Sequence, residues 1–380
     1  MKTRTLAVLS AGTALAAFLL VPLSSAVAAT ISVALQHQAE SVVLASPQGI
    51  VLRHHRGDEF PRGRSVKIDV GPGDGGLTVD GRRVTANQIE VRGRNGDIIL
   101  NGMALPGRLI VKRVNHRLLV INELDFEDYI KGVVPAEMNS NWHLEALKVQ
   151  AIAARTYALY QIRHGTNKDF DIFASTKDQV YRGRNAVNFA VVRAVEQTRD
   201  LIITYQGLPI FAAYHSTAAG PTEDATYVWS MDLPYLKGVE CPFDIESPRY
   251  QWRTDVSLTF LEQRLRDEAF PVGIIASIDP VSYSPSGRVA QVRILHSGGE
   301  LFLRGEDLRR VVGYTTLAST MFDFELTGLR IQFTGRGAGH GVGLCQWGAK
   351  VLAERGYSAG TILTYYYPGT EIRTMTSPSR

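Results

Sequence analysis

The chain changes character at the stretch Gly132-Val133-Val134-Pro135-Ala136-Glu137-Met138. Before this stretch, apolar residues alternate with polar ones in short runs, which is typical of β-strands. After it, apolar residues recur at intervals of three and four along residues 144–163, which predicts a helix that ends before Gly165. Proline favours the first position of a helical turn. We therefore expect an apolar strand to run into Pro135 and to hold Glu137 close to a helix start.

These patterns predict an α+β fold, in which a β-rich N-terminal part precedes a mixed α/β body. The β-rich region is expected to cover residues 30–115. Asp80-Gly81 and Asn95-Gly96 predict hairpins, and the glycine-rich residues 71–76 predict turns, because neither a P-loop lysine nor a helix follows them. Further helices are predicted over residues 344–355 and 359–366.

Residues 1–29 have the features of a secretion signal. Lys2 and Arg4 precede an apolar run, and Ala26-Val27-Ala28 has the small-x-small pattern of a cleavage site. An uncleaved membrane anchor is the alternative. We expect the protein to be secreted across the cytoplasmic membrane and to act in the periplasm or the cell wall.

The charge of the chain limits its expected partners. The net charge of +4 and the pI of about 9.0 suit an anionic wall or membrane surface. No run of lysine and arginine with interleaved aromatic residues is present, so we expect no nucleic-acid partner. At most, we expect peripheral association with a membrane.

The chain has two cysteines, Cys241 and Cys345. Outside the cytoplasm they could form a disulfide, and two separate buried thiols are an equally open alternative. Together with His215 and His340 they could also form a zinc site, but none of the four has the close paired spacing of zinc-finger ligands. We therefore expect neither a metal nor a cofactor.

Glu137 is the candidate for proton transfer. Its apolar neighbours Val133, Val134, Pro135 and Met138 would remove water from the carboxyl group, which raises its pKa. A nearby helix start would act in the opposite direction and favour the carboxylate. Glu137 can serve as an acid near neutral pH only if burial is the stronger effect. The alternative is a structural role, as a helix cap or in a salt bridge.

His215, Ser216 and Thr217 follow an apolar stretch, so we expect polar side chains at a strand end that lines a binding cleft. A serine hydrolase using Ser216 is a further alternative. Adjacent residues of a strand point to opposite faces, however, and the glycine pattern of a nucleophile elbow is absent from the sequence around Ser216.

Residues 335–343, with the sequence GRGAGHGVG, have glycine at alternate positions. Such a segment lets a ligand or another strand approach closely, so either a ligand site around His340 or a tightly packed crossing of the core would explain it. Gln346 and Trp347 follow directly and could offer an amide and a stacking surface to a sugar.

Taken together, several ordered motifs resemble the stage II sporulation protein D family, which includes the amidase-enhancer proteins. They are EDYIKGVVPAEM at residues 127–138, QVY at 179–181, YHS at 214–216, PYL at 234–236, GHGVG at 339–343 and QWGA at 346–349. The resemblance extends from about residue 31 to 373, and it implies a catalytic domain over residues 116–373.

The resemblance implies a lytic transglycosylase that cleaves peptidoglycan glycan strands stripped of their peptides. It implies Glu137 as the catalytic acid and base. The residues that we expect to bind the substrate are Gln179, Tyr181, His215, Ser216, Thr217, His340, Gln346 and Trp347. The alternative is a non-catalytic activator that binds peptidoglycan and stimulates a cell-wall amidase, as the enhancer branch implies.

Two departures from the family pattern affect these expectations. Some relatives bind zinc through cysteine and histidine residues just before the QVY motif, but residues 171–178 here contain neither. Ala219 stands where the family often has glycine, which leaves the fine substrate preference open.

Overall fold

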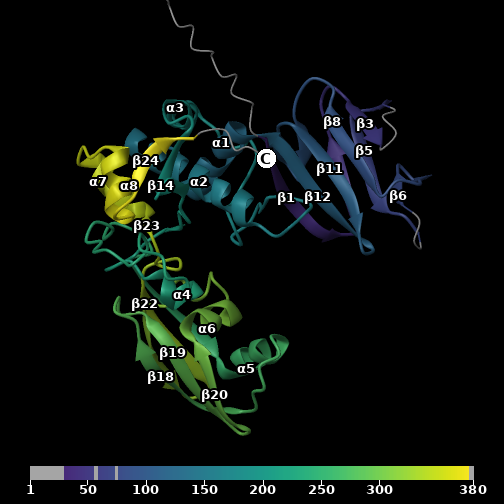
Figure 1. The fold of residues 1–380 in the computed structure, drawn as a ribbon. Coiled ribbons are helices and arrows are strands. Elements are labelled where there is room, and N and C mark those ends of the chain that lie inside the picture. The colour runs from purple at the N-terminus through teal and green to yellow at the C-terminus, as the bar shows by residue number, and fades with distance from the viewer. Residues whose placement is uncertain (1–29, 55–58, 73–75, 376–380) are drawn as a thin grey trace, which may run out of the picture.

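The computed structural model describes residues 30–54, 59–72 and 76–375, so the expected secretion signal at residues 1–29 lies outside the described part. The structure combines several sheets with helices, and it confirms the α+β class with a β-rich N-terminal part (Figure 1). Within the described ranges, no helix has the length and apolar composition needed to cross a membrane.

Two sheets form the N-terminal part. One has the order β13-β1-β12-β11-β8-β3-β4, and the other has the order β10-β9-β2-β5-β6-β7. Buried residues alternate with exposed ones along strands such as β2 and β5, and the buried side chains of both sheets share one hydrophobic core. In chain order the strands are β1 (Thr30–Ala39), β2 (Ser41–Ala45), β3 (Ile50–His54), β4 (Glu59–Arg62), β5 (Ser65–Val70), β6 (Leu77–Val79), β7 (Arg82–Val84), β8 (Gln88–Gly93), β9 (Ile98–Leu100), β10 (Met103–Leu105), β11 (Arg108–Val114), β12 (Arg117–Asp125) and β13 (Ile172–Phe173).

The two predicted hairpins have different outcomes. Asp80 and Gly81 both have positive φ, 48° and 76°, and they join the antiparallel strands β6 and β7, so this hairpin is confirmed. The hairpin at Asn95-Gly96 is wrong, because that turn leads from β8 in one sheet to β9 in the other. The expected domain boundary at residue 115 lies in the turn between β11 and β12 and stays a prediction.

Helix α1 (Phe126–Glu137) replaces the strand that we expected before Pro135. Asp125 caps the helix, and its carboxylate accepts hydrogen bonds from the backbone N–H groups of Glu127 and Asp128 at 2.9 and 3.1 Å. Pro135 lies inside the last turn, so Glu137 is at the C-terminal end of a helix and not at the start of one. Val133 and Val134 favour strands by propensity, but both are fully buried in the core, and tertiary packing decides their conformation.

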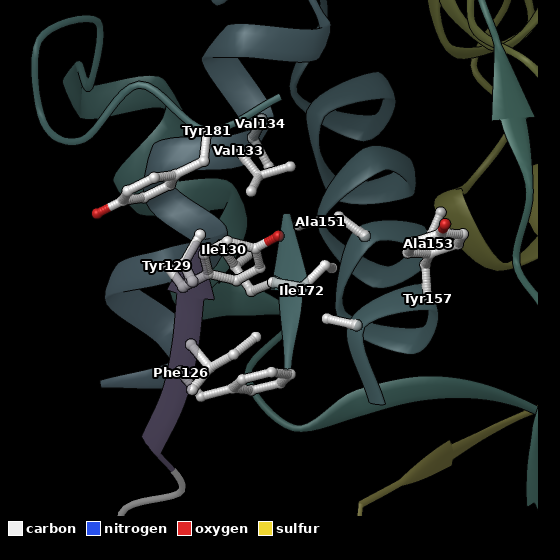
Figure 2. Packing of buried hydrophobic residues seen from close by; sticks show 14 of the residues in the cluster. Phe126, Tyr129, Ile130, Val133, Val134, Ala151, Ala153, Tyr157, Ile172 and Tyr181 are labelled. Atoms are coloured by element: carbon white, nitrogen blue, oxygen red, sulfur yellow. The ribbon is translucent and has the colours of Figure 1, made fainter. Parts of the chain in front are cut away.

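Helix α2 (Leu144–His164) crosses the centre of the protein and confirms the predicted helix, including its end before Gly165. Most of its residues from Ala146 to Leu159 are buried, and it contacts α1, α3 (Phe189–Gln197), α7 (Gln346–Glu354) and α8 (Ala359–Tyr366). Figure 2 shows apolar side chains of α1 and α2, among them Ile130, Val133 and Ala151, in the packing around these helices. A buried ion pair also joins α1 to α2, because Arg155 donates to both carboxylate oxygens of Glu127 at 2.7 Å.

The main body also contains a short helix and two groups of strands. They are α4 (Ala225–Trp229), the antiparallel strands β14 (Leu201–Tyr205), β15 (Leu208–Pro209) and β24 (Glu371–Thr374), and the short parallel pair β16 (Tyr214–His215) and β23 (Leu344–Cys345). The helices predicted over residues 344–355 and 359–366 correspond to α7 and α8.

Residues 251–336, which we call the insert, form a second lobe with its own hydrophobic core (Figure 1). Its elements are β17 (Gln251–Ser257), α5 (Leu258–Asp267), β18 (Ile275–Tyr283), β19 (Val289–His296), β20 (Gly299–Arg304), α6 (Gly305–Val312), β21 (Phe322–Thr327) and β22 (Arg330–Arg336). The first strand, β17, pairs antiparallel with the last, β22, from Gln251 opposite Arg336 to Ser257 opposite Arg330. The chain therefore enters and leaves the insert at neighbouring points, and the core of the main body continues after it.

Candidate active site

Glu137 lies at the last position of α1 and is partly buried. Its Oε1 accepts a hydrogen bond from the backbone N–H of Val180 at 2.6 Å. Glu137 forms no ion pair with any of the described residues, so its alternative role in a salt bridge has no support. Because the negative end of the helix dipole is at the C-terminus, the dipole disfavours the carboxylate here, in contrast to the effect that we expected from the sequence.

Burial raises the pKa of Glu137 from 4.5 to about 7. Hydrogen bonds from the Val180 N–H and the Tyr214 hydroxyl, and the positive charge of Arg182, lower the pKa but do not outweigh the loss of water. At neutral pH, Glu137 therefore exists in both protonation states. A group with these properties can both donate and accept a proton.

Tyr214 is held in place by a buried chain of hydrogen bonds. Its hydroxyl accepts from Gln179 Nε2 at 3.0 Å, and Gln179 Oε1 accepts from the Tyr129 hydroxyl at 3.0 Å. Gln179 Nε2 also donates to the carbonyl of Ala154 in α2 at 3.3 Å. Gln179 is fully buried, so it orients the tyrosine that contacts Glu137 and does not face solvent.

A cleft of about 480 Å³ lies between the main body and the insert, and Tyr214 is part of its wall. The wall on the side of the main body includes Trp229, His340 and Asp178. The insert contributes residues of and near α6. The complete lining is Tyr157, Ser175, Thr176, Lys177, Asp178, Phe211, Ala213, Tyr214, Trp229, Glu306, Arg309, Arg310, Tyr314 and His340. Tyr214 thus connects Glu137 to a cleft with aromatic, acidic and basic side chains.

His340 is the predicted site residue that lines this cleft. Its Nδ1 accepts from the Val342 N–H at 3.1 Å, which leaves the proton on Nε2, and Nε2 donates to the Tyr214 carbonyl at 2.9 Å. Burial lowers the pKa of His340 to about 3, so the ring is neutral. Its ring centroid is 4.8 Å from that of Trp229. His340 thereby supports the backbone of Tyr214 and one aromatic wall of the cleft.

His215, Ser216 and Thr217 do not form a catalytic arrangement. His215 Nδ1 donates to the carbonyl of Val342 at 3.0 Å, and its buried Nε2 has no partner in the described part of the chain. Ser216 Oγ is 3.3 Å from Thr217 Oγ1, and Thr217 is buried against Ser247. His215 therefore does not activate Ser216, and the serine hydrolase alternative has no geometric support.

The other predicted binding residues have mainly structural contacts. Tyr181 is buried and donates to Asn122 Oδ1 at 3.0 Å, while Gln346 is buried and donates to Gln150 Oε1 at 3.2 Å. Trp347 is partly exposed and packs edge-on against Trp142, with ring centroids 5.0 Å apart. Of these residues, the aromatic pair offers a surface to a ligand.

The glycine-rich segment is a tightly packed crossing. A Cβ at Gly339, where φ is +106°, would lie 2.6 Å from His215 Cβ, and a Cβ at Gly343, where φ is +70°, would lie 2.2 Å from the Ala213 carbonyl. Both glycines are therefore required by conformation and by contact. This packing brings β16 and β23 together, so that His215 pairs with Cys345.

Several residues that line the cleft were not among the predicted site residues. Tyr214 was recognised only as part of a motif, and Trp229 and Asp178 had no local signal. The residues of the insert could not be assigned to the site from the sequence, because their position at the cleft depends on how two separately packed lobes meet. The YHS motif at residues 214–216 was the one available signal for Tyr214.

Comparison with known proteins agrees with this architecture. Residues 114–205 match the family described as "Stage II sporulation protein", and residues 228–343, which include the insert, match a "Domain of unknown function". An uncharacterised protein of Brachyspira hyodysenteriae is 36% identical over 72% of this chain and 73% of its own length. The "Stage II sporulation protein D" of Bacillus amyloliquefaciens is 32% identical over 76% of this chain and 84% of its own length. The "Amidase enhancer" of Bacillus subtilis is 31% identical over 64% of this chain but only 40% of its own length. The chain belongs to the stage II sporulation protein D family.

Proposed function

We propose that this protein is a peptidoglycan lytic transglycosylase that acts outside the cytoplasmic membrane, on glycan strands without peptides. The family is associated with cell-wall processing. The observation that supports the finer proposal is the Glu137 carboxyl, whose pKa of about 7 allows it to donate and take back a proton at neutral pH. Glu137 does not line the cleft of about 480 Å³ itself, but Tyr214, whose hydroxyl donates to Glu137, forms part of the cleft wall and gives the carboxyl a neighbour there.

The proposed reaction needs one proton-transfer group. Protonated Glu137 donates its proton to the oxygen that bridges N-acetylmuramic acid and N-acetylglucosamine, and the glycosidic bond breaks. The resulting carboxylate takes the proton from the 6-hydroxyl of the muramic acid, whose oxygen bonds to C1 and closes a 1,6-anhydro ring. The proton balance of Glu137 is restored, and water does not enter the products.

Asp178 is a second carboxyl group at the cleft, and hydrolysis with two carboxylates would be the usual alternative. Its oxygens are engaged, because Oδ1 accepts from the Tyr157 hydroxyl at 3.2 Å and Oδ2 accepts from the Phe173 N–H at 2.8 Å. These contacts favour a role for Asp178 in positioning the segment that contains Lys177. We therefore assign the proton transfers to Glu137 alone.

Product analysis tests this proposal. Purified protein is incubated with peptide-free glycan strands, and the released ends are identified by mass spectrometry. We expect 1,6-anhydro-muramic acid ends from the natural protein and none from Glu137→Gln. Reducing muramic acid ends would instead indicate hydrolysis, and anhydro ends from Glu137→Gln would refute the role of Glu137.

A second candidate function is a non-catalytic activator of a cell-wall amidase. It is favoured by the similarity to a relative named "Amidase enhancer". An activator of this kind would bind peptidoglycan and stimulate a wall amidase equally well with Glu137→Gln, and it would release no glycan ends by itself. Measuring amidase stimulation beside the product analysis separates the two functions.

A further inference from the structure

Cys241, Asp244 and Cys345 meet in the interior of the main body. Each offers a donor atom, and these atoms all lie within 4.8 Å of one another. The three residues are 1%, 0% and 0% exposed. The site therefore joins the turn that precedes the insert to the residue that caps α7.

The spacing and types of these residues suit a transition metal. Cys241 and Asp244 are separated by two residues in a turn, which is the close spacing common among paired zinc ligands, and Cys345 supplies a distant third ligand. Thiolate and carboxylate groups are both common zinc ligands. His215 and His340, which completed the zinc set considered from the sequence, are not part of this group.

Neighbouring donors surround the two sulfur atoms. The backbone N–H groups of Ala218 and Gly348 each donate to Cys345 Sγ at 3.4 Å, and the Tyr366 hydroxyl is 3.2 Å from Cys241 Sγ. Hydrogen bonds of this kind to ligand atoms orient them and stabilise the charge of a bound thiolate.

Asp244 has an oxygen without a partner. Its Oδ2 accepts from the N–H groups of Ala218 and Ala219 at 2.7 and 2.9 Å and is 3.2 Å from Cys345 Sγ. Its Oδ1 is buried and has no hydrogen-bond partner within the described ranges. A buried carboxylate oxygen without a partner is costly, and a cation at this place would remove that cost.

We propose that Cys241, Asp244 and Cys345 bind a structural Zn²⁺ ion. Both sulfur atoms coordinate as thiolates, so binding releases their two protons to solvent, and the fourth position is taken by the second carboxylate oxygen of Asp244 or by water. Two thiolates, one carboxylate and Zn²⁺ leave one negative charge. The buried guanidinium of Arg288 interacts electrostatically with buried Glu223 and also with all three of these residues, so a positive charge lies near the site.

The ion would fix the geometry of the predicted binding motifs. Asp244 holds the backbone after Thr217, and Cys345 directly precedes Gln346 and Trp347 in α7. Zinc removal would therefore loosen both segments and the start of the insert. A disulfide between Cys241 and Cys345 is the competing outcome, but it would leave Asp244 Oδ1 without a partner.

Metal analysis of the whole protein tests the proposal. The chain is produced with zinc in the medium and without chelators, and its metal content is measured by inductively coupled plasma mass spectrometry. We expect about one Zn²⁺ per chain. After exchange with Co²⁺, we expect a thiolate-to-cobalt charge-transfer band in the near ultraviolet. Chelation should lower the Tm of the natural protein.

Two variants and a control complete the test. Cys345→Ser and Asp244→Asn should lose the zinc, while Asp232→Asn, at an exposed carboxylate, should keep it. Intact mass under denaturing conditions reports the state of the two thiols without any variant. A natural protein that contains no zinc would overturn the proposal, whether its mass shows two free thiols or, lower by two hydrogens, a disulfide. Full zinc content in Cys345→Ser would overturn it as well.

Discussion

Replacing Glu137 by glutamine should change how the stability of the protein depends on pH. The folded state raises the pKa of Glu137 from 4.5 to about 7, so at low pH, where the carboxyl is protonated in both the folded and the unfolded state, no buried charge destabilises the fold. As the pH rises from 4.5 through about 7, the unfolded state releases its proton before the folded state does, so the free energy of unfolding falls. The difference of about 2.5 pKa units corresponds to roughly 3 kcal/mol. Glutamine does not titrate, and its oxygen can still accept the hydrogen bond from Val180.

The expected result is therefore a stability difference that grows with pH. Relative to the natural protein, Glu137→Gln should gain about 3 kcal/mol in the free energy of unfolding between about pH 4 and about pH 8. Urea unfolding of both proteins over this range measures it. Other titrating groups affect both proteins alike, so the difference isolates Glu137. A difference that stays constant with pH would show that this carboxyl has the same pKa folded and unfolded, and would refute the reasoning.

Three further substitutions test the site and the core. In the natural protein, kcat/KM should fall at alkaline pH with a midpoint near the Glu137 pKa. Tyr214→Phe removes a hydrogen bond that favours the carboxylate, so this midpoint should move about one pH unit higher. Trp229→Ala removes an aromatic wall of the cleft and should raise KM about tenfold with little change in kcat, as measured by steady-state kinetics on glycan strands. Arg155→Met leaves Glu127 buried without its partner and should lower the free energy of unfolding by about 3–5 kcal/mol, as measured by urea unfolding.

Controls for these substitutions come from exposed positions. Phe189→Ala, at a side chain that is 81% exposed, should leave KM unchanged. Arg373→Met breaks an exposed ion pair with Glu371 and should cost less than about 1 kcal/mol. An unchanged pH profile in Tyr214→Phe, an unchanged KM in Trp229→Ala, or equal effects of the two arginine substitutions would contradict the assignments.

The helices with a clear periodicity could be predicted from the sequence, and α1 could not. The spacing of residues 144–163 and Gly165 indicated α2 and its end, and α8 was predicted at its observed bounds. In α1, Val133 and Val134 favour a strand by local preference, and Pro135 favours a helix start. Burial of this segment against α2 outweighs that preference.

The identity of Glu137 as the candidate could be predicted, but its surroundings could not. Its apolar neighbours indicated desolvation, whereas the hydrogen bonds from Val180 and Tyr214 join residues more than 40 positions away. Local sequence also gave no sign that residues 251–336 pack as a separate lobe whose α6 forms one wall of the cleft. Both features depend on long-range packing.

The most direct test is a measurement of the Glu137 pKa in the folded protein. The side-chain carboxyl carbon is followed by ¹³C NMR as the pH is changed, and its signal is assigned by its absence from Glu137→Gln. We predict a titration midpoint at about 7. A midpoint close to 4.5, the ordinary value for glutamate, would contradict the proposal that Glu137 is the acid and base of the reaction.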